Sequence, residues 1–269
     1  MFFIPQDPAA LNSREVGVNQ PHIPRFCKFS DSPRWIPTSA RGKMQPLSHT
    51  PSTPRHSIFP AQLLLQPPVL RRSMTPLQIV PHPHPALRRK SREVVRIDAE
   101  LHEIVRQMFE LMYAARGVGL AANQVGLPYR LFVINPEGDP NQKDQELVFL
   151  NPRITKKKGS EDDEEGCLSL PEIYGPVTRA TELVVDAFDL SGRQFELKLS
   201  DFPARIIQHE NDHLDGVLFI DRLQPTVRNQ LQPLIADLEK QFSDRQRDGL
   251  WPSDQQLQEQ LVSLEKLRT

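Results

Sequence analysis

The 269-residue sequence predicts an α+β fold with antiparallel strands, and three observations support this prediction. A helical apolar period covers residues 98–115. Two strand-like stretches, 181–189 and 193–200, are joined by a short turn sequence, which is typical of a β-hairpin. Strands and helices do not alternate strictly along the chain, so a parallel sheet built from βαβ units is disfavoured.

The first 73 residues differ from the rest in composition. They hold 12 of the 26 prolines, scattered among Ser, Thr, Arg and His, and they lack a sustained apolar period. Such a segment buries too little apolar surface to offset the entropy of ordering it, so we expect disorder. Two further interpretations stay open: a basic, acid-poor transit peptide for an organelle, or a translation start that truly lies at Met74.

Charge is distributed unevenly between this leader (1–73) and the remainder. The leader carries a net charge of +6, from nine basic and three acidic residues, and the remainder carries −7. An acidic remainder argues against a protein that binds nucleic acid or an anionic membrane surface. No run of about 18 apolar residues occurs, so we expect no membrane-spanning helix.

An amphipathic helix opens the patterned part of the chain. Its apolar residues recur at helical spacing: Leu101, Ile104, Val105, Met108, Leu111, Met112 and Ala115. Asp98 is suited to cap the N-terminus, and Gly117 is suited to end the helix. Strands are predicted next at 129–135 and 145–152, with a turn-rich stretch between them.

A second helix follows the hairpin and contains the sequence QHENDHLDG. Pro203 suits its first turn, and Gly216 suits its end. His209 and His213 are four residues apart, so both side chains lie on one face of the helix. Two such imidazoles can bind one metal ion, and Glu210 between them is placed to act as a base. Two histidines that merely fill a core would need polar partners, so we favour the metal site.

The remaining elements are predicted from shorter patterns. An apolar run at 217–220 predicts a short strand. A closing helix follows at 226–242, with Pro233 as a local irregularity. The last stretch, 253–269, is weakly amphipathic and predicts a loose terminal helix.

A catalytic site of this kind needs a third protein ligand. No histidine follows His213. The downstream glutamates lie in polar helical surroundings that are typical of exposed faces: Glu239, Glu259 and Glu265. Upstream, the stretch EGCLSLP contains Cys167, the single cysteine outside the leader. A lone thiol is often buried filler, but beside a two-histidine helix we interpret Cys167 as the third ligand.

The charge of this ligand set favours catalysis over a purely structural site. Two neutral imidazoles and one thiolate leave a divalent ion with a net charge of about +1, which lowers the pKa of a bound water towards neutrality. A structural site would be closed by a fourth Cys or His, and no such candidate is evident.

A third stretch, GVGLAANQVG at 117–126, follows the first helix. It lacks the lysine of a phosphate-binding loop, and its simplest interpretation is a glycine-rich turn. Gln124 lies among small and apolar residues, where its side-chain N–H is able to face a developing oxyanion.

Together and in this order, GVGLAANQVG, EGCLSLP and QHENDHLDG resemble the three motifs of the peptide deformylase family. The resemblance covers about 74–242 and includes LNPRI at 150–154. It implies antiparallel β-sheets packed around a central helix that carries the HExxH motif, with an N-terminal and a C-terminal helix. The leader and the tail beyond about residue 245 lie outside the resemblance, so we expect a catalytic domain at 74–245 and a C-terminal extension at 246–269, for which a helix is one candidate structure.

The resemblance also implies roles for individual residues. The implied metal ligands are Cys167, His209 and His213. The implied catalytic residues are Glu210, which exchanges a proton, and two oxyanion donors, the Gln124 side chain and the Leu168 N–H. The implied substrate-binding positions are Val118, Gly119, Leu120, Glu165 and Gly166.

The reaction that the resemblance implies is removal of the formyl group from the N-terminal formyl-methionine of newly synthesised polypeptides, with release of formate. Its cofactor is one divalent metal ion, Fe(II) first, with Zn, Ni or Co as alternatives that suit the same ligands. N-formylmethionyl nascent peptides are the implied partners, and ribosome docking stays open. A thiolate and a ferrous ion favour a reducing compartment, so we expect the cytoplasm first and an organelle as the alternative.

Two other functions stay open from the sequence. A zinc endopeptidase would cleave unformylated internal peptide bonds and would tolerate the loss of Cys167. A binding module without turnover would hold its ligand and release no formate, but the presence of Glu210 argues against it.

Overall fold

The computed structural model describes residues 76–268, so the leader that we expect to be disordered lies outside the described residues. The helices and strands are α1 (Ala99–Ala114), β1 (Gly119–Ala121), β2 (Leu131–Ile134), β3 (Leu147–Lys158), β4 (Glu161–Cys167), β5 (Leu170–Arg179), β6 (Glu182–Phe188), β7 (Gln194–Ser200), α2 (Asp201–Leu214), α3 (Pro225–Arg247) and α4 (Asp254–Arg268). None of the helices in this part of the chain is long and apolar enough to cross a membrane.

The strands between residues 119 and 200 form two sheets. The larger sheet has the strand order β1-β2-β3-β6-β7, and β4 pairs with β5 in a separate two-stranded sheet. Every pairing within these sheets is antiparallel. The α+β class with antiparallel sheets is therefore confirmed.

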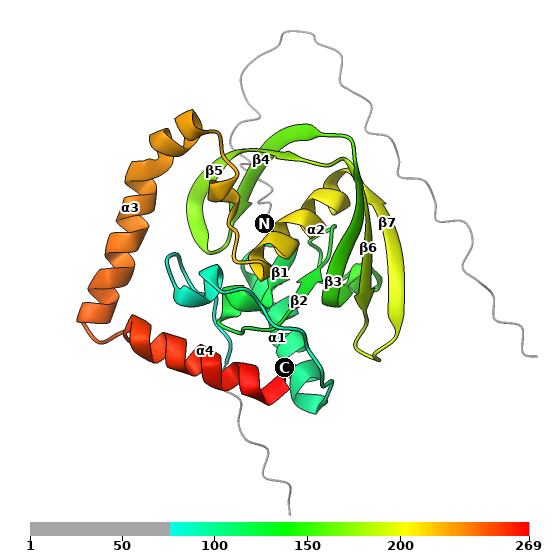
Figure 1. The fold of residues 1–269 in the computed structure, drawn as a ribbon, viewed down its shortest axis with the longest axis horizontal. Coiled ribbons are helices and arrows are strands. Elements are labelled where there is room, and N and C mark those ends of the chain that lie inside the picture. Colours follow the sequence, from blue (N-terminus) through cyan, green and yellow to red (C-terminus); the bar gives the residue numbers. More distant parts are fainter. Residues whose placement is uncertain (1–75, 269) are drawn as a thin grey trace, which may run out of the picture. The chain divides into compact units, whose positions relative to one another are not determined.

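Helix α2 lies in the centre of the molecule, inside the curve of the strands (Figure 1). It contacts β1, β2, β6 and β7 of the larger sheet. Its apolar residues Ala204, Ile206 and Ile207 join a core cluster with Phe132 and Phe149 of that sheet. Because the apolar side chains hold the helix in the interior, its polar side chains are also carried away from solvent.

Helix α1 forms as its periodicity predicts. The Asp98 carboxylate accepts a hydrogen bond from the Leu101 N–H at 2.9 Å, which caps the first turn. The buried face of the helix packs Met108 and Met112 into a second core cluster. The residue with a left-handed backbone conformation just after the helix is Arg116, with φ of 57°. It is not Gly117, which we expected to end the helix.

The apolar run at 217–220 is not a strand. It forms an extended stretch followed by a 3₁₀ turn, η4 (Phe219–Asp221), and Leu218, Phe219 and Ile220 are buried in a third core cluster. The Asp221 carboxylate accepts from the Leu218 N–H at 2.9 Å, so this donor is satisfied locally and not by a neighbouring strand. The prediction was wrong because an apolar run reports burial and does not report strand pairing.

The hairpin of β4 and β5 has no counterpart among the predicted elements. Strand β4 begins with four exposed acidic residues, 161–164, so it lacks the alternation of apolar and polar residues that marks a half-buried strand. It pairs with β5 from Glu161 to Cys167. This pairing is what brings the EGC stretch to the centre of the molecule.

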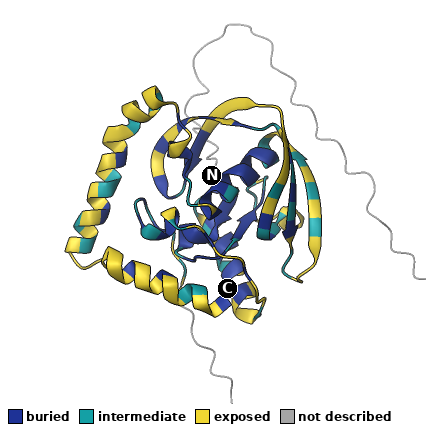
Figure 2. Cartoon of the chain, in the orientation of Figure 1, coloured by how far each residue is buried: buried dark blue, intermediate teal, exposed yellow. Residues whose placement is uncertain are grey.

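Helices α3 and α4 run along the outside of the strand layers (Figure 1), and most of their residues are exposed (Figure 2). Helix α3 continues through Pro233 and buries only Ile235 and Phe242. At the end of α4, the Arg268 side chain donates to Asp98 and to Glu100, each at 2.6 Å. These bonds hold α4 against the start of α1, so the terminal helix is not loose as we expected.

Candidate metal centre

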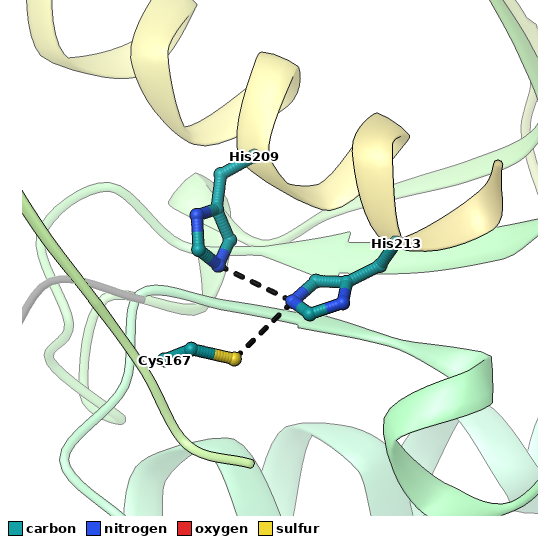
Figure 3. Close-up of side chains that lie close together, drawn as sticks. All are labelled: Cys167, His209 and His213. Atoms are coloured by element: carbon teal, nitrogen blue, oxygen red, sulfur yellow. Dashed lines mark hydrogen bonds between the residues drawn. The ribbon is translucent and has the colours of Figure 1, made fainter. Parts of the chain in front are cut away.

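Three potential metal ligands converge in the interior. Cys167 ends β4, whereas His209 and His213 lie one turn apart on α2, and the three side chains point toward one another (Figure 3). Their ligand atoms all lie within 4.8 Å of one another. His213 Nε2 is 3.3 Å from Cys167 Sγ and 3.2 Å from His209 Nε2. The fold therefore brings together the donors that the sequence predicts.

The state of the two imidazoles suits a bound cation. The Glu165 carboxylate accepts a hydrogen bond from His209 Nδ1 at 3.0 Å, so the lone pair of His209 Nε2 points to the centre of the site. Burial lowers the pKa of His209 to about 4 and holds the pKa of His213 well below its ordinary value. Two neutral nitrogens and one sulfur in a buried space form a ligand set for a borderline or soft divalent ion.

The sulfur of Cys167 is surrounded by groups that a cation would complement. Burial raises the pKa of the Cys167 thiol to about 11, which favours the protonated form. A bound divalent cation would favour the thiolate instead, because a coordinating thiol is deprotonated. Gln124 Nε2 donates to Cys167 Sγ at 3.3 Å, while Gln124 Oε1 accepts from the Ala121 N–H at 2.9 Å. The second bond orients the amide so that its N–H₂ group faces the sulfur.

Glu210 is a buried carboxyl beside this group. Neither of its oxygens has a hydrogen-bond partner among residues 76–268. Burial raises the pKa of Glu210 to about 7, and the negative charge of Glu165 adds to the increase. A Cβ atom at Gly119 would lie 2.4 Å from Glu210 Oε1, so the carboxylate lies directly against the backbone of β1. A carboxyl that titrates near neutrality is able to accept and return a proton.

The residues predicted to bind substrate fall in different environments. The side chains of Val118 and Leu120 are buried, one in each of the two core clusters that flank β1. Only their backbone groups can therefore meet a ligand. Gly119 lies between them in β1, which is an edge strand of the larger sheet.

The remaining predicted positions lie around Cys167. A Cβ atom at Gly166 would lie 2.6 Å from the ring of Tyr174, so any larger residue there would force that ring to shift. Leu168 is partly buried and follows Cys167 directly, which places its backbone N–H beside the sulfur in the chain. Glu165 has no exposed surface and is bonded to protein side chains, so it supports His209 and is not open to a ligand.

Two charged residues next to Glu165 were not predicted. Arg179 donates to both oxygens of Glu165, at 2.8 and 2.9 Å, and Arg205 donates to one of them at 3.1 Å. Burial alone would raise the pKa of Glu165, but the hydrogen bonds from Arg179 and His209 outweigh it and hold the pKa well below its usual range. No local pattern marks Arg179 in the sequence, because its partners come from β4 and α2.

The comparison with known proteins agrees with this geometry. A family model described as polypeptide deformylase matches residues 76–229. The chain belongs to the polypeptide deformylase family. Enzymes of this family remove the formyl group from the N-terminus of nascent polypeptides, and they depend on a metal ion. The chain is therefore an amide hydrolase of that specificity, as the three motifs predicted.

Deformylases of bacteria and plants are similar to the chain. A peptide deformylase of Rhodopirellula baltica is 41% identical over 194 residues, which span 72% of this chain and 96% of that protein. The chloroplastic peptide deformylase 1B of Solanum lycopersicum is 42% identical over 173 residues, 64% of this chain and 62% of that protein. The chloroplastic/mitochondrial form of Arabidopsis thaliana is 43% identical over 172 residues, 64% of this chain and 63% of that protein.

Solved deformylase structures share the fold. A crystal structure of a plant peptide deformylase superposes with a TM-score of 0.62 and 42% identity, covering 67% of this chain and 96% of that one. The enzyme of Thermotoga maritima superposes with a TM-score of 0.53 and 37% identity, covering 56% of this chain and 100% of that one.

Proposed function

We propose that Cys167, His209 and His213 bind the catalytic divalent ion, and that Glu210 moves the proton during deformylation. The observation that carries this proposal is the convergence of one sulfur and two nitrogen atoms within 4.8 Å, beside a buried carboxyl. Fe(II) is the first candidate, and Zn, Ni or Co suit the same ligands. When bound, the ion supplies a Lewis acid that lowers the pKa of water and polarises the formyl oxygen.

Glu210 serves as the acid and base of the reaction. It accepts a proton from the attacking water as the new C–O bond forms at the formyl carbon. It then gives the proton to the departing methionine amine as the C–N bond breaks, and formate is released. The raised pKa of Glu210, about 7, supports both steps near neutral pH.

Gln124 and Leu168 stabilise the oxyanion that develops on the formyl oxygen. The Gln124 side-chain N–H₂ group has two hydrogens, and its contact with Cys167 Sγ uses one of them. The other is available to the oxyanion, together with the Leu168 N–H. The bond from the Ala121 N–H to Gln124 Oε1 supports this role, because the amide is oriented before substrate arrives.

The free edge of β1 binds the peptide as an added strand. Strand β1 pairs with β2 on one side, so the backbone at Gly119 can hydrogen-bond an extended ligand on the other. The absence of a side chain at Gly119 allows the ligand and Glu210 to approach the same backbone. The formyl group is thereby delivered next to the proposed ligands.

The test is to purify the full chain without oxygen, measure its metal and assay formate from a formyl-methionyl peptide. We expect about one Fe(II) per chain and formate release, with less Fe(II) retained in Cys167→Ser. Unchanged metal content in Cys167→Ser would remove Cys167 from the ligand set. Cleavage of unformylated internal bonds without formate would favour an endopeptidase.

We also propose that residues 74–245 form the catalytic domain, that 246–269 extend it, and that the leader directs the enzyme to an organelle. The net charge of the leader, +6, and the compartments in the names of the two plant relatives support the last point. These relatives do not support our first expectation of the cytoplasm. Imaging of a fluorescent protein fused to residues 1–73 in plant cells tests it, and diffuse cytoplasmic signal would contradict it.

Ribosome docking remains a hypothesis for this chain. The exposed surfaces of α3 and α4 mix basic and acidic residues and form no continuous basic stripe, so electrostatics alone give weak support. Co-sedimentation of the full chain with ribosomes, at low and at physiological salt, decides whether the C-terminal helices take part.

A further inference from the structure

A chain of ion pairs leads from the metal centre to the surface of the protein. His209 donates to Glu165, and Arg179 donates to Glu165 at 2.8 and 2.9 Å. Arg179 also donates to Asp212 at 2.5 Å, and Arg222 donates to both oxygens of Asp212. Each member thus holds the next, and basic and acidic groups alternate along the chain.

The side chains in this series of ion pairs become more exposed with distance from the metal centre. The exposed fraction of the side chain is 0% for Glu165, 4% for Arg179, 11% for Asp212 and 41% for Arg222. The inner three groups are charged and buried, so each depends on its partners for stabilisation. Arg222 is the outermost member and the one that solvent reaches.

Asp212 is shared by two guanidinium groups. Its Oδ2 atom accepts from both Arg179 and Arg222, and its Oδ1 atom accepts from Arg222. Because Arg222 binds both oxygens, it fixes the rotation of the carboxylate. A fixed carboxylate in turn holds Arg179 in its bidentate position on Glu165, which orients His209.

The position of Arg222 in the fold separates it from the chemistry. It follows η4 and lies three residues before α3 begins, whereas Asp212 lies on α2 between the two histidines. The segment that leads into α3 therefore clamps α2 from the outside, at the turn that carries the proposed ligands.

We infer that Arg222 is a positioning residue for the metal centre, acting on His209 through Asp212, Arg179 and Glu165. This inference rests on the proposed metal site. Loss of Arg222 frees the Asp212 carboxylate to rotate, loosens Arg179 on Glu165, and so lets the His209 ring depart from the orientation that a metal ion requires.

The experiment compares Arg222→Met with Arg228→Met in the Co(II)-loaded full chain. The two arginines are matched, because their side chains are 41% and 44% exposed and lie six residues apart, yet Arg228 contacts Asp221 at 3.5 Å and is outside the chain of ion pairs. The rate of Co(II) loss to excess chelator reports retention, and the visible absorption of bound Co(II) reports the arrangement of its ligands.

We expect Arg222→Met to lose Co(II) about threefold to tenfold faster than the unsubstituted chain, with altered Co(II) absorption. Arg228→Met should match the unsubstituted chain in both measurements. Arg222→Lys should fall between the two, since lysine keeps the charge but cannot bind both carboxylate oxygens in a fixed plane. If Arg222→Met does not fold, Arg222→Lys carries the same comparison.

Equal rates of Co(II) loss for the unsubstituted chain and for both arginine variants would overturn the inference. A lower melting temperature of Arg222→Met with unchanged Co(II) loss and absorption would also overturn it, because the role would then be structural. Failure of the proposed metal site looks different: the unsubstituted chain would bind no Co(II), or Cys167→Ala would bind it equally well, and the inference would fall with it.

Discussion

Helix α2 is shorter than helix α3, but more of its residues are buried. Helix α2 has 14 residues and buries ten of them, whereas α3 has 23 residues and buries two. Six of the buried residues in α2 are polar or charged. The burial view shows the contrast directly (Figure 2). A helix rich in polar residues is therefore not necessarily a surface helix, since partners on other elements can satisfy its buried groups.

The two helices should respond differently to substitution. Polar residues of α2 face the proposed metal centre or hold the groups around it, so changes there should act on chemistry. Helix α3 touches the rest of the protein through a few side chains, so changes there should act on stability or have no effect. Each of the following tests can break this division.

The largest effect is expected for Glu210→Ala. The variant should retain its metal but lose deformylation by about a hundredfold to ten-thousandfold, because the proton that moves between water and amine loses its carrier. Formate release and metal content are measured on the same sample. Near-full activity would show that Glu210 has no role in the reaction and that a buried carboxyl of α2 can be dispensable.

A smaller loss is expected for Gly119→Ala. The added Cβ would lie 2.4 Å from Glu210 Oε1, so the carboxylate must move. A displacement of about 1 Å at a reacting group costs about a hundredfold in rate, and we expect kcat to fall by about tenfold to a hundredfold. Gly249→Ala is a control for backbone strain alone: no atom lies within 4 Å of its new Cβ, but its φ of 73° strains an alanine, and kcat should stay unchanged. Full kcat in Gly119→Ala would mean that Glu210 is not held at this position during catalysis.

In α3, the strongest effect should be on stability. Phe242 is buried and packs against the rings of His84 and Trp251. Phe242→Ala should lower the free energy of unfolding by about 3 kcal/mol and leave kcat at 25 °C unchanged. Leu234→Ala, at a position that is 48% exposed, should change it by less than about 0.5 kcal/mol. Urea unfolding measures both, and an equal effect of the two substitutions would contradict the proposed difference between the faces of α3.

A smaller effect than that of Phe242→Ala is the pH dependence of stability that His84 contributes at the same contact. Burial lowers the pKa of His84 to about 4, although Asp254 opposes the shift. The unfolded chain, with an ordinary pKa of about 6.5, then binds more protons than the folded chain between pH 6.5 and 4. Stability should therefore be full above pH 6.5 and fall as the pH decreases, by about 2 kcal/mol at pH 5. His84→Asn should remove this part of the dependence, and an unchanged difference between pH 7 and pH 5 would contradict the assignment.

The sequence was sufficient for the elements whose residues repeat with a clear period. Helix α1 and the β6–β7 hairpin follow directly from their apolar spacing. Strand β4 was not predicted from the sequence, because its first four residues carry exposed carboxylates. A strand that is held by backbone pairing to β5 needs no apolar period. The apolar run at 217–220 led to the opposite error, because Leu218, Phe219 and Ile220 are buried in a core cluster although none of them belongs to a strand.

For the site, the sequence by itself determined that His209 and His213 share one face of a helix, because a four-residue spacing is a local property of the backbone. It also singled out Cys167, Glu210 and Gln124 by residue type. Only the tertiary structure decided that Cys167 meets the two rings and that Glu165 turns inward to His209 and Arg179. The physical reason is that these contacts join residues 14 to 46 positions apart in the sequence, and such contacts depend on how the β4–β5 hairpin packs beside α2 and not on any local pattern.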